Sequence, residues 1–483
     1  MRPLISSALF ALVMLAVPVR AELFDSKLEP FLDALDDMQT RYVDETKVTT
    51  AKLTENSIKG IVDALDSESL LLDKDKPLGT AGLGISIAVK DGAAYVYDVE
   101  DGGAAESAGL RAGDRILRVD GKGVSGKKRL EVEGLLRGAA GSRAMLLWAD
   151  SRASYREVSL TRSPMAMPAW RSVRLDSVEV VQVFRLDSAS AKDISAWLIK
   201  LDPAVVSGAL LDLRLCHMGD PDAGIALADA CLGGKELIAT GTGVNPKYSR
   251  QYTAKKKDAW VRLPLVAVTG PWTAGAAEIF AGALQSHHRA VLVGEKTFGF
   301  AARQQDFPVN DGRTLRLTVE RFSTPLSSSI TGKGLDPDLP VSAQVPGKTA
   351  LYLDDHNVAE KYAERIVKEP PAEYDPDALK RGEMKLTLAE LKDRSVAEQR
   401  SEFETTFQIS LEAMLRDLEL EADREDLEEN RAMLISRVRV ILARRLMKPA
   451  DALLVGLRED PAIKMAADSI GALERLSGRE KKQ

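Results

Sequence analysis

The chain of 483 residues contains only two cysteines, Cys216 and Cys231, and only four histidines. No histidine stands at a zinc-ligand spacing from these cysteines, so we expect no metal site and no cofactor. The residues between the two cysteines predict a loop and a helix at Pro221 to Leu232, which would hold the cysteines roughly 15 Å apart. Because a disulfide requires Cα atoms within about 7 Å, we predict two free, buried thiols.

The chain also has no excess of basic residues: it contains 66 basic and 72 acidic residues, and its net charge is −6. A nucleic-acid partner would call for a clustered basic face, so this balance argues against one. Aromatic residues make up only 5% of the chain, while the hydrophobic content of 45% is sufficient for a core. The length predicts more than one domain.

Long apolar runs are absent except at the N-terminus, where LISSALFALVMLAVPV follows Arg2. This run and the segment Val19-Arg20-Ala21 have the pattern of a secretory signal peptide over residues 1–21, cut after Ala21. The run is short for a membrane span, and no cysteine follows it to carry a lipid. We therefore expect an exported chain with no membrane span after cleavage, with an uncleaved signal anchor as the alternative.

Changes of pattern divide the remaining chain into four parts: residues 22–76, 77–162, 163–349 and 350–483. Residues 22–76 are predicted to form a helical arm packed on the main body. Its two apolar stripes are Phe31, Leu32, Leu35 and Met38, and then Leu53, Ile58, Ile61, Val62 and Leu65.

Residues 77–162 consist of short β-type runs and glycine turns. Gly82-Leu83-Gly84-Ile85 opens a strand, Asp91-Gly92 is a hairpin signal, and SAGLRAGDRILRVDG follows from Ser107 to Gly121. This combination resembles a PDZ domain of the bacterial kind. The resemblance implies that the glycine-rich loop captures a peptide's C-terminal carboxylate while the tail extends the sheet along the strand. The residues expected to bind the peptide are Leu83, Gly84, Ile85 and Ile87; as the alternative, they are simply core residues of a small β-domain.

Residues 163–349 alternate strands with helices of 10 to 15 residues, which predicts an α/β layered core. Four segments carry a further resemblance: LDLR at Leu211, AEIFAGALQ at Ala277, RAVLVGEKTFG at Arg289 and GKGLDPDLPV at Gly332. With the PDZ-like part they are similar to the carboxy-terminal processing peptidases (tail-specific proteases), over roughly residues 25 to 350. The resemblance implies a ClpP/crotonase-like fold, an exported and periplasm-like location (the cell exterior being the alternative), and serine–lysine chemistry on protein C-termini.

The segment Leu263 to Gln305 predicts a strand, a tight turn and a helix beginning near Thr273, the place where a hydrolase holds its nucleophile. The family's nucleophile is the middle serine of a Ser-Ala-Ser-Ala-Ser-Glu-Ile run, and its base is the lysine that closes Thr-Phe-Gly-Lys. Here those positions are Gly275 and Phe300, separated by the 25 residues that the family's dyad keeps. The glutamine that follows the lysine is retained as Gln304. The family's oxyanion loop corresponds to Leu215 to Gly219, with Met218 in place of a glycine next to Gly219.

Three interpretations follow. The first is a pseudopeptidase that binds protein tails, unfolded proteins or an active peptidase relative without cutting, because a serine hydroxyl and a neutral lysine are both needed. The second is an active peptidase with Thr273 as the nucleophile and Lys296 or a histidine as the base. The third is a structural oligomer.

Residues 350–483 carry no such match and are predicted to be helical after a Pro-rich linker at Lys368 to Arg381. Their apolar stripes must pack against another surface. That surface is the body of the chain, the extension itself or another copy of the chain. A homo-oligomer through residues 385–476 is the sharper of these possibilities. The stripes are Phe403, Phe407, Leu411, Met414, Leu415 and Leu418, and then Leu434, Val438, Ile441 and Leu442.

Overall fold

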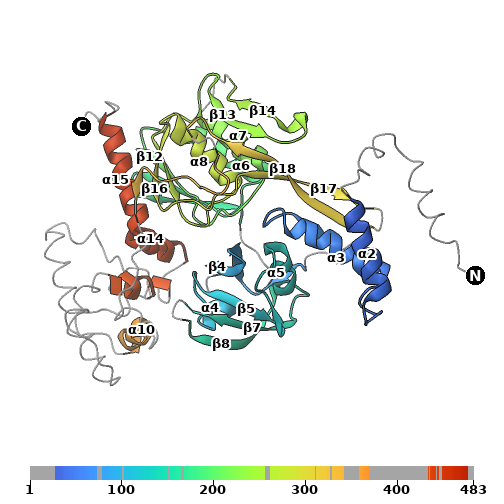
Figure 1. Cartoon of the computed structure of the whole chain (residues 1–483). Coiled ribbons are helices and arrows are strands. Elements are labelled where there is room, and N and C mark those ends of the chain that lie inside the picture. Colours follow the sequence, from blue (N-terminus) through green and yellow to red (C-terminus); the bar gives the residue numbers. More distant parts are fainter. Residues whose placement is uncertain are drawn as a thin grey trace, which may run out of the picture.

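The protein is described by a computed structural model over residues 28–72, 79–100, 103–150, 153–164, 168–255, 261–309, 312–326, 329–341 and 358–368, and over residues 433–476 with gaps at 435, 442 and 445–448. Figure 1 shows an α/β core above a small β-domain. A helical arm lies on one side and the C-terminal helices lie on the other.

The core is a six-stranded sheet in the order β10-β11-β12-β15-β16-β19. β10 (Trp170–Leu175) pairs antiparallel with β11 (Val178–Val183), and the other neighbours pair in parallel. β12 (Gly208–Asp212) and β15 (Leu265–Thr269) are buried along their whole length. β16 (Ala290–Gly294) and the short β19 (Leu339–Pro340) complete it. Nearly continuous apolar strands are expected where both faces of a parallel sheet are covered, and the α/β prediction is confirmed.

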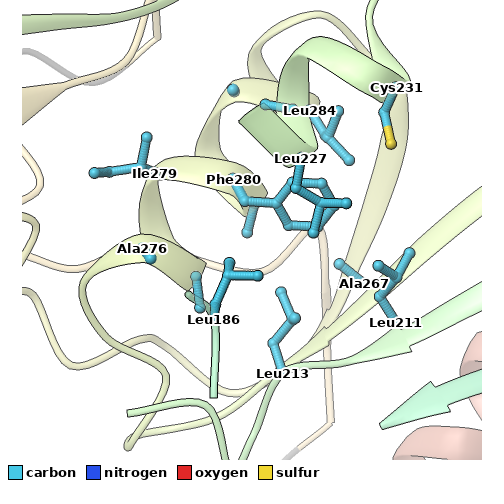
Figure 2. Packing of buried hydrophobic residues seen from close by; sticks show 14 of the residues in the cluster. Leu186, Leu211, Leu213, Leu227, Cys231, Ala267, Ala276, Ile279, Phe280 and Leu284 are labelled. Carbon is cyan, nitrogen blue, oxygen red and sulfur yellow. The ribbon is translucent and has the colours of Figure 1, made fainter. Parts of the chain in front are cut away.

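Three helices cover one face of this sheet: α6 (Ser188–Lys200), α7 (Pro221–Cys231) and α8 (Ala276–Ser286). Asp187 caps α6 by accepting a hydrogen bond from Ser190 N, and Pro221 begins α7, where a missing N–H costs nothing. Figure 2 shows Phe280 and Leu284 of α8 packed against α7 and the strands. Cys216 and Cys231 lie in this cluster as buried free thiols, as predicted.

The opposite face of the sheet is covered from the far end of the chain, by α14 (Pro449–Glu459) and α15 (Pro461–Leu476). Ile463, Ala466 and Ile470 recur on one side of α15 and are fully buried against the strands. Asp460 caps α15 by accepting from Ala462 N and Ile463 N, and it also binds Arg214 at 2.6 Å. Residues 449–476 thus pack within the chain, whereas the predicted stripe from Phe403 to Leu418 lies outside the described residues.

A second sheet has the order β1-β18-β13-β14, with β17 also paired to β18. β17 (Ala302–Pro308) and β18 (Thr314–Ser323) form a long hairpin, and β13 (Leu237–Thr242) and β14 (Arg250–Thr253) form a shorter one. β1 (Leu70–Leu72) adds the end of the N-terminal arm to β18.

The β-domain has the strand order β3-β4-β5-β7-β8, and its longer helix α5 (Arg129–Leu136) lies beside β3. The larger strands are β3 (Ile85–Lys90), β4 (Ala93–Val99), β5 (Arg115–Val119), β7 (Arg143–Ala149) and β8 (Tyr155–Thr161). The short elements are β2 (Ala81–Gly82), α4 (Ala104–Ser107), β6 (Lys122–Gly123) and β9 (Ser163–Pro164). In this order β3 is a terminal strand, so one of its edges is unpaired among the described strands.

One buried lysine ties the arm to this domain. Lys128, at the start of α5, donates through Nζ to the carbonyl oxygens of Val62, Asp66 and Ser69. The neighbouring Arg129 pairs with Glu68. Ser69 Oγ in turn accepts from Thr318 N of β18 at 3.1 Å. The segment between α3 (Thr50–Asp63) and β1 therefore holds the β-domain and the core together.

The first helix of the arm differs from the expectation that the arm packs on the body. α2 (Glu29–Arg41) has no buried residue, and its predicted stripe at Phe31, Leu32 and Met38 is exposed. Its contact with α3 is a hydrogen bond from Gln39 Nε2 to Thr50 Oγ1 at 2.8 Å. Hydrophobic periodicity predicted the helix correctly, but periodicity does not state what covers a stripe.

Among the described residues, no helix is both long and apolar enough to cross a membrane.

The docking of α15 predicts the effect of shortening one side chain. Ile470→Ala should lower the free energy of unfolding by about 2–5 kcal/mol, because it leaves a cavity against the sheet where Ile470 is 0% exposed. Met465→Ala on the same helix is the control, since Met465 is 44% exposed. Urea denaturation of both variants measures the difference. An equal loss in the two variants would contradict this packing.

Candidate functional site

Thr273 closes the turn between β15 and α8 with its side-chain hydrogen bonds. The helix does not begin at this residue. Thr273 Oγ1 accepts from Gly270 N and donates to Leu213 O, both at 3.0 Å, and the residue is fully buried. The helix itself begins at Ala276, three residues later than predicted. The hydroxyl of Thr273 is therefore committed to the backbone of its own turn and of the strand beside it.

Gly275 stands at the N-cap of α8, with φ +65° and ψ −121°. A positive φ favours glycine, and the surroundings restrict the position further. A Cβ placed on Gly275 would lie 2.8 Å from the carbonyl carbon of Met218 and 2.9 Å from its Cα and its oxygen. Backbone at that distance has to move before any side chain fits. The volume of a nucleophile's side chain is thus filled by the loop from Leu215 to Gly219.

This loop is held close to α8 by its own contacts. Ala274 N donates to Cys216 O at 3.2 Å, and Asp220 N donates to Leu186 O at 3.0 Å. Met218 has φ +70°, an uncommon conformation for a residue with a side chain. Gly219 has φ +110°, and a Cβ there would meet Leu186 O at 2.7 Å. The structure therefore places the predicted oxyanion-loop residues next to Gly275, with the carbonyl of Met218 occupying the space.

Phe300 comes next to Gly275, as the spacing of the dyad predicts. Gly275 N donates to Phe300 O at 3.0 Å, and the Phe300 side chain is only 6% exposed. An apolar ring at this position can neither accept nor donate a proton. The base position is thus adjacent to the nucleophile position, but it carries no titratable group.

The two other candidates are Lys296 and Gln304. Lys296 pairs with Asp336 at 3.0 Å, and its side chain is 54% exposed. Gln304 lies on β17 opposite Thr318 of β18. Its Nε2 and the Oγ1 of Thr318 are both buried without a hydrogen-bond partner.

Glu278 is a residue that the sequence analysis did not select. Its carboxylate is fully buried on the first turn of α8 and accepts from Gly275 N, Gly299 N and Phe300 N at 3.3, 2.7 and 2.8 Å. Thr297 Oγ1 donates to it as well. Burial raises the pKa of Glu278 to about 7, against the opposing effect of these hydrogen bonds. The Glu in the AEIFAGALQ run was the available signal, since a glutamate three residues after an N-cap predicts a capping box.

Aromatic side chains from the β-domain cover the same site. Tyr97 lies 5.4 Å from His217 and 6.4 Å from Trp272, and Phe298 lies 5.1 Å from His217, measured between ring centroids. His217 Nδ1 is 2.9 Å from Trp272 O. Burial, and then the charge of Arg129, lower the pKa of His217 to about 4, so its ring is neutral at pH 7. No sequence pattern linked Tyr97 to His217, because they come from different domains.

The predicted peptide-binding residues divide into two groups. Leu83, Ile85 and Ile87 are buried in the core of the β-domain, so a peptide would meet this strand through its backbone edge. Gly84 has φ +73°, which the turn before β3 requires, and its carbonyl oxygen accepts from Glu100 N. No group of three or more metal-ligating side chains occurs among the described residues.

Comparisons with known proteins agree with this architecture. The model of peptidase family S41 matches residues 173–341, and a PDZ domain model matches residues 95–150. A carboxy-terminal-processing protease of Bartonella bacilliformis is 29% identical over 342 residues, covering 68% of this chain and 77% of that protein. The carboxy-terminal processing protease CtpA of Bacillus subtilis is 27% identical, covering 68% of this chain and 72% of that protein.

Among solved structures, the photosystem II D1 C-terminal processing protease superposes with a TM-score of 0.54 at 24% identity, over 67% of this chain and 95% of that one. This likeness supports the fold of the core and of the PDZ domain together. Residues 173–341 therefore match peptidase family S41 and residues 95–150 match a PDZ domain, in a chain that is similar to carboxy-terminal processing proteases.

Proposed function

We propose that this chain is an exported pseudopeptidase, which binds protein C-terminal tails through its PDZ domain and does not cleave them. The single observation that carries the proposal is the position of the Met218 backbone, 2.8–2.9 Å from where a side chain on Gly275 would begin. A missing hydroxyl alone would leave an empty site. Here the space is filled and the neighbouring base position holds Phe300, so neither reacting group has a replacement in place.

The geometry of Thr273 and Lys296 weighs against the alternative of an active, threonine-based peptidase. The Thr273 hydroxyl already donates to Leu213 O, and Lys296 is half-exposed and paired with Asp336. His217 hydrogen-bonds to Trp272 O within the aromatic cluster.

Tail binding is supported by the unpaired edge of β3 and by the glycine loop that precedes it. An extended peptide can add to such an edge by main-chain hydrogen bonds while loop N–H groups hold its carboxylate. The leader at residues 1–21 supports export, and we place the protein in a periplasm-like compartment. An unfolded protein with an apolar tail, or an active relative, is the partner class that this edge would accept.

Cleavage is the first test. The purified exported protein should leave an unfolded substrate with an apolar C-terminus intact, while an active carboxy-terminal processing protease degrades the same substrate in parallel. Gly275→Ser combined with Phe300→Lys should remain inactive as well, because Met218 blocks the serine. Cleavage that disappears in Thr273→Ala would refute the pseudopeptidase proposal. Cleavage by the double variant alone would show that the loop from Leu215 to Gly219 moves to make room for the serine side chain.

Tail binding is tested at Gly84. Gly84→Glu should weaken the binding of a fluorescent tail peptide at least about tenfold, or about 1.4 kcal/mol, because it adds a side chain and a negative charge to the carboxylate loop. Gly121→Glu is the matched control, since Gly121 has φ +74° and no atom within 4 Å of an added Cβ. Equal affinities for the two variants in fluorescence polarisation would contradict the assignment of this groove.

The titration of Glu278 tests the buried hydrogen bonds that this side chain makes with Gly275, Gly299 and Phe300. Its folded-state pKa, about 7, lies above the unfolded value of 4.5, so the folded state binds the proton more tightly. Stability from this group therefore falls as pH rises from about 4.5 to about 7, by at most about 1.4 kcal/mol per pH unit. The stability of wild type relative to Glu278→Gln should decline over this range in urea titrations at pH 5, 6, 7 and 8. A constant difference would contradict the raised pKa.

A further inference from the structure

A groove lies between the two hairpins of the second sheet. Figure 1 shows the β13–β14 hairpin beside the β17–β18 hairpin, and β13 pairs with β18 from Thr240 to Thr242. The loop that follows β13 and the middle of β18 line a volume of about 880 Å³. Small-molecule sites occupy roughly 300–1,000 Å³. Gly275 and Phe300 are not among the lining residues, so this groove is separate from the candidate peptidase site.

Apolar side chains form much of the lining of the groove. They are Val244, Tyr248, Phe307, Leu317 and Val319. Phe307, Leu317 and Val319 are partly exposed, and Val244 is fully exposed. Apolar side chains that gather around one hollow mark a binding site, whereas scattered ones need no explanation. The groove therefore offers surface against which an apolar ligand can be buried.

The charges that line the groove favour an anion. Lys247 and Arg321 are both exposed, and no carboxylate of the described residues pairs with either side chain. Lys247 Nζ lies 4.5 Å from the centroid of the Tyr248 ring. The acidic residue in the lining, Glu320, is buried and already paired with Arg303 at 2.7 Å. A ligand in the groove therefore meets two positive charges that the protein does not neutralise.

The main-chain groups around the groove distinguish a lipid-like ligand from a peptide. A peptide that binds to a sheet gains its affinity from main-chain hydrogen bonds. Here Gly243 N donates to Ser249 Oγ at 3.2 Å, and Thr318 N of β18 donates to Ser69 Oγ at 3.1 Å. β17 pairs with the other edge of β18. A ligand with an aliphatic chain and one anionic group needs no main-chain partners, so it fits this lining better.

We propose that the groove binds an aliphatic carboxylate of the fatty-acid class. The chain lies along Phe307, Leu317 and Val319, where each buried methylene group favours binding. The carboxylate faces Lys247 and Arg321, whose charge-assisted hydrogen bonds fix its position. This site shares no residue with the PDZ groove or with the turn at Gly275, so it does not depend on whether the chain cleaves or binds protein tails.

Isothermal titration calorimetry with laurate, below its micelle-forming concentration, tests the proposal on the purified exported protein. Lys247→Gln combined with Arg321→Gln should weaken laurate binding at least about tenfold, because both charges that meet the carboxylate are removed. Lys235→Gln is the matched control and should leave the affinity unchanged, since Lys235 is exposed and lies outside the lining. Gly84→Glu should also leave it unchanged, which separates this site from the PDZ groove. Circular dichroism confirms that the variants are folded.

Four results would overturn the proposal. The first is no binding of laurate up to its micelle-forming concentration, and the second is an affinity that the double variant leaves unchanged. Equal affinity for dodecyltrimethylammonium, a cation with an alkyl chain of similar length, would mean that the groove does not select an anion. A peptide of alternating valine and glutamate that displaces laurate at a lower concentration than laurate itself requires would make an acidic peptide the ligand.

Discussion

The buried carboxylate of Glu278 connects the parts of the candidate site. It accepts hydrogen bonds from the backbone of Gly275 on one side and of Gly299 and Phe300 on the other. The N–H groups of Gly299 and Phe300 would otherwise be buried without this partner, at a cost of about 1–3 kcal/mol each, whereas Gly275 N also donates to Phe300 O. Gly275 and Phe300, at the positions of the family's nucleophile and base, are thus kept together by a buried glutamate. This explains how the peptidase frame persists here without serine or lysine at these positions.

The PDZ domain is attached to the rest of the chain from two directions. Lys128 and Arg129 bind the segment that joins the arm to β1, and Tyr97 packs on His217 and Trp272. On another side, Arg111 pairs with Glu360 of α10 (Val358–Lys368), and Glu106 pairs with Arg444. The exposed pairs contribute little individually. The buried lysine contributes more, because three carbonyl oxygens lose a charged donor if it is removed.

Local pattern was sufficient to predict much of this molecule. The strands at Leu265–Thr269 and Ala290–Gly294, the adjacency of Gly275 and Phe300, and the free cysteines follow from apolar runs and from spacing. Features that depend on distant residues were not accessible in this way. The conformation of Met218 depends on Leu186 and α8, the cluster around His217 depends on Tyr97 of another domain, and the exposure of α2 depends on what its neighbours leave uncovered. The late start of α8 has a local cause, since Thr273 bonds to Gly270 and closes a turn first.

The covering of the sheet by α15 also has a consequence for how the chain acquires its structure. Strands β10 to β16 are complete by residue 294, yet Ile463, Ala466 and Ile470 come from a segment about 170 residues later. Until that segment has been synthesised, Val180, Leu210, Val266 and Val268 have no apolar cover from it. A nascent core with such a face open is prone to aggregation. The sheet therefore keeps one face without this cover during the interval between the synthesis of β16 and the docking of α15.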